Sequence, residues 1–271
     1  MRNLQEVDIK LSRGNTHCRV NDQGNGEWVV LVHGLITPQF SWRFLFEDLV
    51  KSGYKVVSFD FYGRGKSDIP KIEYNFDLYI QQLDEIIHYF CKAEKPNIVA
   101  WSMGGALSSL YAMKHTQTIN KLVLIAPGIV IAAGHWMKQF LHHSLASSLF
   151  IKTGKMTLED RMQQQFNKPN DYEDYYEKAT EQTKRQGFWE SLVSIIVNYP
   201  ENLLDILHYY PEESPKPLII WGEDDKITDY KDSKEVAKKL GGKLLTLSDA
   251  SHAIHYEYPE QVNQAIINFL K

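Results

Sequence analysis

The chain has 271 residues, of which 43% are hydrophobic and 24% are charged, a composition typical of a globular protein with a sizeable buried core. The formal net charge is −4 and the basic residues are dispersed, which excludes a nucleic-acid partner because phosphate binding requires a clustered basic face. No apolar run approaches the roughly 18 residues of a membrane span, and the first residues lack the apolar segment of a secretory signal. The two cysteines, Cys18 and Cys91, are typical of reduced intracellular thiols, so we expect a cytoplasmic protein.

Short apolar runs alternate with longer amphipathic segments, which predicts an α/β fold with a mostly parallel sheet and helices on both faces. An alternating pattern at residues 7–11 and 17–20 predicts an antiparallel hairpin at the sheet edge. The strands predicted after it cover residues 28–32, 54–60, 97–101, 121–125, 217–221 and 243–247. The helices predicted around these strands cover residues 41–51, 78–90, 104–114, 231–240 and 259–270.

Residues 128–213 interrupt this alternation, because only helical patterns occur there. The predicted helical pieces cover residues 136–149, 158–166, 172–185 and 188–197. No Gly/Ser-rich linker separates this block from the rest of the chain. The sequence therefore predicts an α/β core formed by residues 1–127 and 214–271, with an all-helical cap (lid) at residues 128–213 inserted between two strands.

The segment NIVAWSMGGA at residues 97–106 places Ser102 between an apolar strand and a helix. Small residues at Ala100 and Gly104 let the strand turn abruptly into the helix without a collision of side chains. Such a turn lifts the serine Oγ above the sheet edge and places it at a helix N-terminus, where negative charge is favoured. A serine that only caps the helix is the alternative that this segment leaves open on its own.

Polar side chains follow three further predicted strands. His33 and Gly34 follow residues 28–32, Asp225 follows residues 217–221, and His252 follows residues 243–247. Because the carboxyl ends of parallel strands share one rim, Ser102, Asp225 and His252 are predicted to meet there as nucleophile, acid and base.

The backbone N–H groups of Leu35 and Met103 are the predicted oxyanion hole for this triad. His33 itself is expected to hold the local loop. The order Ser, Asp, His along the chain is the one used by the α/β-hydrolase fold.

With these motifs, the chain resembles the α/β-hydrolase family over about residues 28–270. The spacing of Gly222 and Asp225 resembles the family's acid turn and favours Asp225 over Asp224. His252, followed by Glu257, resembles the family's histidine segment and is favoured over His255. Two departures are Ala100, where the family's nucleophile elbow, G-x-S-x-G, has its first glycine, and Ser251, where the family usually has glycine before the histidine.

The segment DFYGRGKS at residues 60–67 resembles the family's D-x-x-G-x-G-x-S loop. A nucleotide-binding loop is the alternative interpretation, but Asp68 stands where its third glycine would fall, so a structural turn bordering the site is predicted. The ten histidines form no H-E-x-x-H pattern, and we expect neither a metal nor a cofactor.

The resemblance implies a serine hydrolase, and a carboxylesterase or short-chain lipase acting on a small, apolar ester is expected first. The alternative is a carbon–carbon bond hydrolase of the meta-cleavage type, which usually has asparagine where this chain has Trp101 and uses a cap arginine. Arg161 and Arg185 are the arginines of the cap, and neither lies in a motif. A non-catalytic binding protein on the same fold is the third possibility.

The substrate pocket and the assembly are less constrained by the sequence. Candidate pocket residues are His33, Trp101, Trp136, Phe140 and Trp189. The aromatic members indicate an apolar substrate, although a cap must also pack on the core. The oligomeric state is left open.

Overall fold

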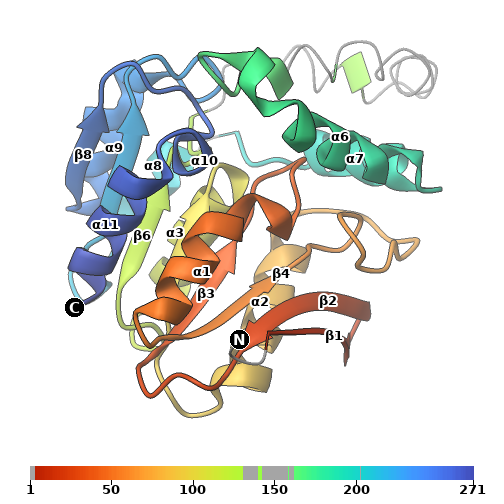
Figure 1. Ribbon diagram of the computed structural model, residues 1–271, viewed down its shortest axis with the longest axis horizontal. Helices are drawn as coiled ribbons and strands as arrows, with labels where there is room; N and C mark the ends of the chain where they lie inside the picture. The colour runs from red at the N-terminus through yellow and green to blue at the C-terminus, as the bar shows by residue number, and fades with distance from the viewer. Residues whose placement is uncertain (1–3, 131–139, 142–157, 159–161, 202) are drawn as a thin grey trace.

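The computed structural model describes residues 4–130, 140–141, 158, 162–201 and 203–271 (Figure 1). One eight-stranded sheet runs through this part of the chain in the order β1-β2-β4-β3-β5-β6-β7-β8. Its strands are β1 (Gln5–Leu11), β2 (Gly14–Asn21), β3 (Trp28–Val32), β4 (Lys55–Phe59), β5 (Asn97–Trp101), β6 (Leu122–Ile125), β7 (Leu218–Gly222) and β8 (Lys243–Leu247). β1 and β2 form an antiparallel hairpin, β2 pairs antiparallel with β4, and the other pairings are parallel. The predicted fold class and edge hairpin are confirmed.

Helices cover both faces of the sheet. α1 packs against α11 in front of the sheet in Figure 1, and α2 packs against α3 behind it. The α-helices of the described residues are α1 (Arg43–Lys51), α2 (Phe76–Cys91), α3 (Met103–Lys114), α6 (Glu173–Glu181), α7 (Phe188–Val197), α8 (Leu203–Ile206), α9 (Ser233–Leu240), α10 (Ile254–Glu257) and α11 (Pro259–Leu270). The sequence did not predict α8 and α10, because a helix of one turn is too short to show a 3.6-residue period.

Strand register brings the strand ends together. β3 and β5 are buried along their whole length, as expected for strands covered on both faces. Val32 pairs with Ala100, so the residues that follow β3 lie beside Ser102. At the other side of the sheet Gly222 pairs with Leu247, which aligns the loops that follow β7 and β8. All four loops therefore leave the sheet at the same rim.

Helices and turns make up the described part of residues 128–213. α6 and α7 lie across one end of the sheet (Figure 1). The predicted helix at 188–197 is α7, whereas the prediction at 172–185 corresponds to α6 flanked by the 3₁₀ turns Pro169–Tyr172 and Gln182–Lys184. The predicted helix at 136–149 lies almost wholly outside the described residues, as does part of 158–166. The division into a core and a cap stays a prediction.

Cys18 and Cys91 are both buried and form no disulfide. Burial raises the pKa of both thiols, so neither is poised to react as a thiolate. Among the helices of the described residues, none has the length and apolar character needed to cross a membrane.

Candidate active site

Ser102 occupies the turn between β5 and α3 in a strained conformation. Its φ of 56° and ψ of −123° are unusual for a residue with a side chain, and such strain persists only where surrounding structure enforces it. The Ser102 amide donates to the Ile125 carbonyl at 3.0 Å, and its carbonyl accepts from the Gly128 amide at 2.8 Å. A Cβ at Gly104 would lie 2.5 Å from the His33 carbonyl oxygen, so only glycine lets α3 approach β3 this closely.

His252 lies in the loop after β8, with its Nε2 2.9 Å from Ser102 Oγ. The flanking backbone is held on both sides. The Ser251 amide donates to Glu257 at 2.9 Å, and the Ala253 amide donates to the Gln165 carbonyl at 2.9 Å. The imidazole is thus presented to the serine by a loop that is anchored to α10 and to the segment preceding α6.

Asp225 lies in the turn after β7, and its side chain is fully buried. Its Oδ2 lies 2.8 Å from His252 Nδ1, and its Oδ1 accepts from the amides of Ile227 and Thr228 at 2.8 and 2.9 Å. Asp224 is exposed and accepts from Asn167 Nδ2 at 3.0 Å instead. The structure therefore brings Asp225, and not its neighbour, to the histidine.

Sequence reasoning missed Thr228, whose hydroxyl donates to Asp225 Oδ2 at 2.7 Å. The same hydroxyl lies 3.3 Å from His252 Nδ1 and 3.3 Å from the Ala126 carbonyl. Asp225 thus accepts four hydrogen bonds, which satisfies a buried carboxylate. The only sequence signal was a hydroxyl residue three positions after the acid, and such a pattern is too common to stand out.

The two predicted oxyanion donors belong to segments next to Ser102. Met103 is the first residue of α3, so its amide belongs to the first turn, whose N–H groups have no acceptor inside the helix. Leu35 follows Gly34, where an added Cβ would lie 3.2 Å from Ser102 Cβ. The carbonyl of Leu35 accepts from Arg64 Nε at 2.6 Å, which restrains this loop.

His33 is enclosed by protein and held by backbone groups. Its Nδ1 bonds the Gly34 carbonyl at 2.7 Å, and its Nε2 accepts from the Phe61 amide at 2.9 Å. Burial lowers the pKa of His33 to about 3, with a smaller contribution from the nearby Arg64 charge, so the imidazole is neutral. These bonds occupy both ring nitrogens. No polar atom of the ring is therefore left for substrate, and the predicted place of His33 in the pocket stays a prediction.

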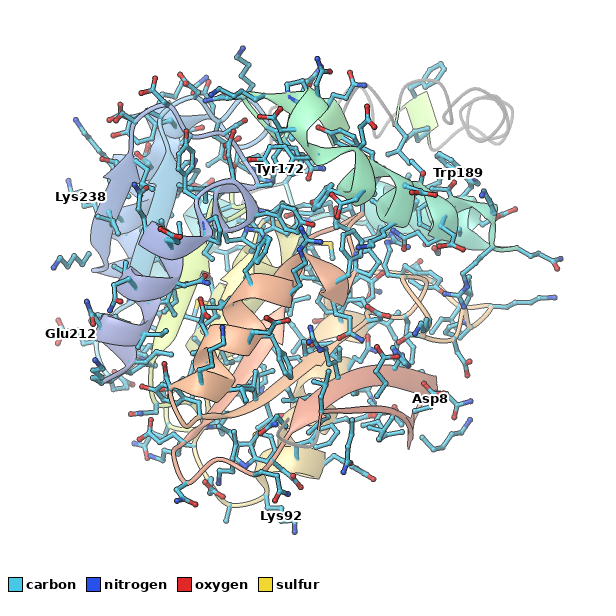
Figure 2. All side chains as sticks on the ribbon, in the orientation of Figure 1. Asp8, Lys92, Tyr172, Trp189, Glu212 and Lys238 are labelled. Carbon is cyan, nitrogen blue, oxygen red and sulfur yellow. The ribbon has the colours of Figure 1, made fainter. Side chains whose placement is uncertain are left out.

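The other predicted pocket residues differ in exposure. Trp101 is only 2% exposed, and its indole Nε1 donates to the His252 carbonyl at 3.0 Å; its place in the substrate pocket stays a prediction. Trp189, labelled on α7 in Figure 2, is 7% exposed and belongs to the hydrophobic core, whereas Phe140 is 48% exposed. Trp136 lies outside the described residues.

The Arg185 side chain bonds to the backbone of the loop at residues 60–67. Its guanidinium donates to the backbone carbonyls of Arg64, Gly65 and Ser67, the last at 2.7 Å. It therefore joins the predicted cap to the loop at residues 60–67. In that loop Gly63 and Gly65 have φ values of 79° and 51°, and Asp60 accepts from the Lys66 amide at 2.9 Å, as expected for a structural turn.

A pocket of about 400 Å³ lies beside the loops that carry the acid and the base. Its lining comes from the segment before α6 and from the neighbours of the two catalytic candidates: Gln163, Gln164, Phe166, Asn167, Pro169, Asp224, Lys226 and Ser251. In the part of the chain that the structure describes, no group of three or more His, Cys, Asp or Glu side chains is arranged to hold a metal ion.

A family model described as the alpha/beta hydrolase fold matches residues 27–259. Among curated proteins, the chain is 27% identical to the 2-hydroxy-6-oxo-6-(2'-aminophenyl)hexa-2,4-dienoic acid hydrolase of Metapseudomonas resinovorans, with 97% of this chain and 91% of that protein covered. It is 24% identical to the 2-hydroxy-6-oxo-6-phenylhexa-2,4-dienoate hydrolase of Comamonas testosteroni, with 93% and 90% covered.

Solved structures show the same fold. The enol-lactonase from Burkholderia xenovorans LB400 aligns with a TM-score of 0.81 at 19% identity, covering 97% of this chain and 99% of that chain. A thermophilic esterase from Thermogutta terrifontis aligns with a TM-score of 0.81 at 20% identity, covering 98% of each chain. At this identity the likeness concerns the fold alone.

Proposed function

The chain belongs to the alpha/beta hydrolase family, and on that premise we propose that it cleaves carboxylic esters through an acyl-enzyme at Ser102. The observation that carries the proposal is the continuous chain of contacts from Ser102 Oγ to His252 at 2.9 Å and from His252 to Asp225 at 2.8 Å. Asp225 carries no proton in this scheme, so it accepts the Nδ1 proton of His252. The Nε2 lone pair then faces the serine hydroxyl.

In the proposed reaction His252 takes the hydroxyl proton as Ser102 Oγ forms a bond to the ester carbonyl carbon. The amides of Leu35 and Met103 stabilise the resulting oxyanion. The carbon–oxygen bond to the alcohol breaks as His252 returns the proton to the leaving oxygen. Water then repeats the same steps on the acyl-enzyme, which releases the acid and restores Ser102.

Carbon–carbon bond hydrolysis is the second candidate, because the curated relatives above are dienoic acid hydrolases. Two observations favour the ester. Trp101 stands where the meta-cleavage enzymes usually have asparagine, and its ring is enclosed by protein. Arg185 is committed to three backbone carbonyls, which leaves it poorly placed to pair with the carboxylate of a dienoic acid, whereas the other cap arginine, Arg161, lies outside the described residues.

Parallel assays separate the candidates. We expect a p-nitrophenyl ester series of increasing acyl length to be hydrolysed with a higher kcat/KM than a coloured 2-hydroxy-6-oxo-dienoate, and the reverse order would favour the carbon–carbon reaction. A fluorophosphonate should label Ser102, and Ser102→Ala should abolish labelling and lower kcat by about 10⁶ while the protein stays folded. A protein that neither reacts with the probe nor hydrolyses either substrate would be a binding protein on this fold.

A further inference from the structure

We propose that Trp101 is a positioning residue that holds the base His252 in reach of the nucleophile, an inference that rests on the function proposed above. Trp101 is the last residue of β5 and immediately precedes Ser102. Its indole Nε1 donates to the backbone carbonyl of His252 at 3.0 Å, across 151 positions of sequence. The side chain next to the nucleophile is therefore bonded to the backbone of the base.

The ring of Trp101 also packs against the segment that carries an oxyanion donor. A Cβ at Gly34 would lie 3.1 to 3.2 Å from the six-membered ring of the indole, which is tighter than ordinary packing. Gly34 precedes Leu35, one of the two proposed oxyanion donors. The Trp101 ring centroid lies 5.3 Å from that of the His252 imidazole. One buried side chain thus contacts the segments that carry the nucleophile, the base and an oxyanion donor.

The bond to Trp101 matters because the His252 carbonyl lies just before a helix. α10 begins at Ile254. The amides of Tyr256 and Glu257 donate the first hydrogen bonds of this helix, and both donate to the Ala253 carbonyl. The His252 carbonyl is one residue too early for these bonds, so its hydrogen bond comes from the indole. A buried carbonyl that loses its donor is destabilised and the backbone shifts to recover a partner. A displacement of about 1 Å at a reacting group can lower a rate by about 10²-fold.

Trp42 provides a natural comparison. The imidazole of His255 lies 4.7 Å from the ring of Trp101 and 4.7 Å from the ring of Trp42. Both tryptophans are almost completely buried. In the described part of the chain, however, the indole nitrogen of Trp42 has no hydrogen-bond partner. Replacing Trp42 by phenylalanine therefore repeats the change in ring size without removing a hydrogen bond.

The test compares Trp101→Phe with Trp42→Phe. With a p-nitrophenyl ester we expect kcat to fall about 10- to 100-fold in Trp101→Phe with KM changed by less than about threefold, because the loss affects the reacting groups and not substrate binding. Trp42→Phe should keep kcat within about threefold of the unmodified protein, at a melting temperature similar to that of Trp101→Phe. The rate at which a fluorophosphonate labels Ser102 should fall by the same factor as kcat.

A second readout does not depend on turnover. The proton shared by His252 Nδ1 and Asp225 is expected as a sharp low-field ¹H NMR signal in the unmodified protein and in Trp42→Phe, and as a broadened or absent signal in Trp101→Phe. Equal losses of kcat and of melting temperature in both variants would overturn the positioning role, as would full activity with an unchanged signal in Trp101→Phe. If the unmodified protein turned over no ester, the proposed function would fail, and the NMR comparison would still decide the role of Trp101.

Discussion

The identity of the acid gives the sharpest prediction, because Asp224 and Asp225 are adjacent and only one of them touches the base. In Asp225→Asn the side-chain oxygen is expected to keep accepting from the amides of Ile227 and Thr228, since these bonds, at 2.8 and 2.9 Å, need an acceptor. The NH₂ group then takes the place of Oδ2, 2.8 Å from His252 Nδ1. Two donors cannot bond each other, so the imidazole must move its proton to Nε2.

A proton on Nε2 prevents His252 from accepting the serine proton at a distance of 2.9 Å. A triad with the wrong tautomer loses about 10⁴ in kcat, or about 5.5 kcal/mol of transition-state stabilisation. The Thr228 hydroxyl, which also donates to Oδ2, can turn to the Ala126 carbonyl at 3.3 Å, so we expect the fold to survive.

Asp224→Asn is the matched control. Asp224 is exposed and its partner is the side-chain amide of Asn167, so kcat should stay within about tenfold, or about 1.4 kcal/mol. Both variants are assayed at saturating p-nitrophenyl ester, with melting temperatures to verify folding. If the large loss appeared in Asp224→Asn instead, the acid would be misassigned by one residue. Small losses in both would refute a triad.

Two further predictions concern pH and the predicted cap. The kcat/KM of ester hydrolysis should rise with pH to a plateau, because a general base must be unprotonated to accept the serine proton. His33 and His255 should not contribute to this pH dependence, since burial lowers the pKa of each to about 3 and keeps both neutral above this value. A flat profile between about pH 5 and 8 would contradict a histidine base, and two ionisations in that range would contradict the neutrality of His33 and His255. Trp189→Ala should destabilise the protein by about 3–5 kcal/mol because Trp189 belongs to the core, whereas Phe140→Ala at a 48% exposed position should change the free energy of unfolding by less than about 0.5 kcal/mol. Denaturant unfolding measures both, and a stable Trp189→Ala variant with an altered acyl preference would instead assign Trp189 to the pocket.

Much of the fold was predictable because buried parallel strands are continuous apolar runs. β3, β5 and β8 have the predicted bounds, and the helix at 259–270 begins at Pro259 as predicted. Ser102, Asp225 and His252 could be predicted to meet from one topological rule, since each lies in the turn or loop that follows a strand and parallel strands end at one rim. Local patterns carry this information because side-chain period and strand length are properties of neighbouring residues.

Burial and hydrogen-bond partners were decided by the tertiary structure alone. Phe140 and Trp189 are both aromatic residues of the predicted cap, yet one is exposed and the other belongs to the core. Thr228 and Trp101 acquire their contacts with the triad because the turn after β7 and the end of β5 converge on His252, which is 24 positions from Thr228 and 151 from Trp101. Amino-acid type and periodicity determine which elements form and which side chains end at the rim. The bonds among those side chains depend on ångström-scale distances between remote segments, which are set only when the sheet and its loops pack.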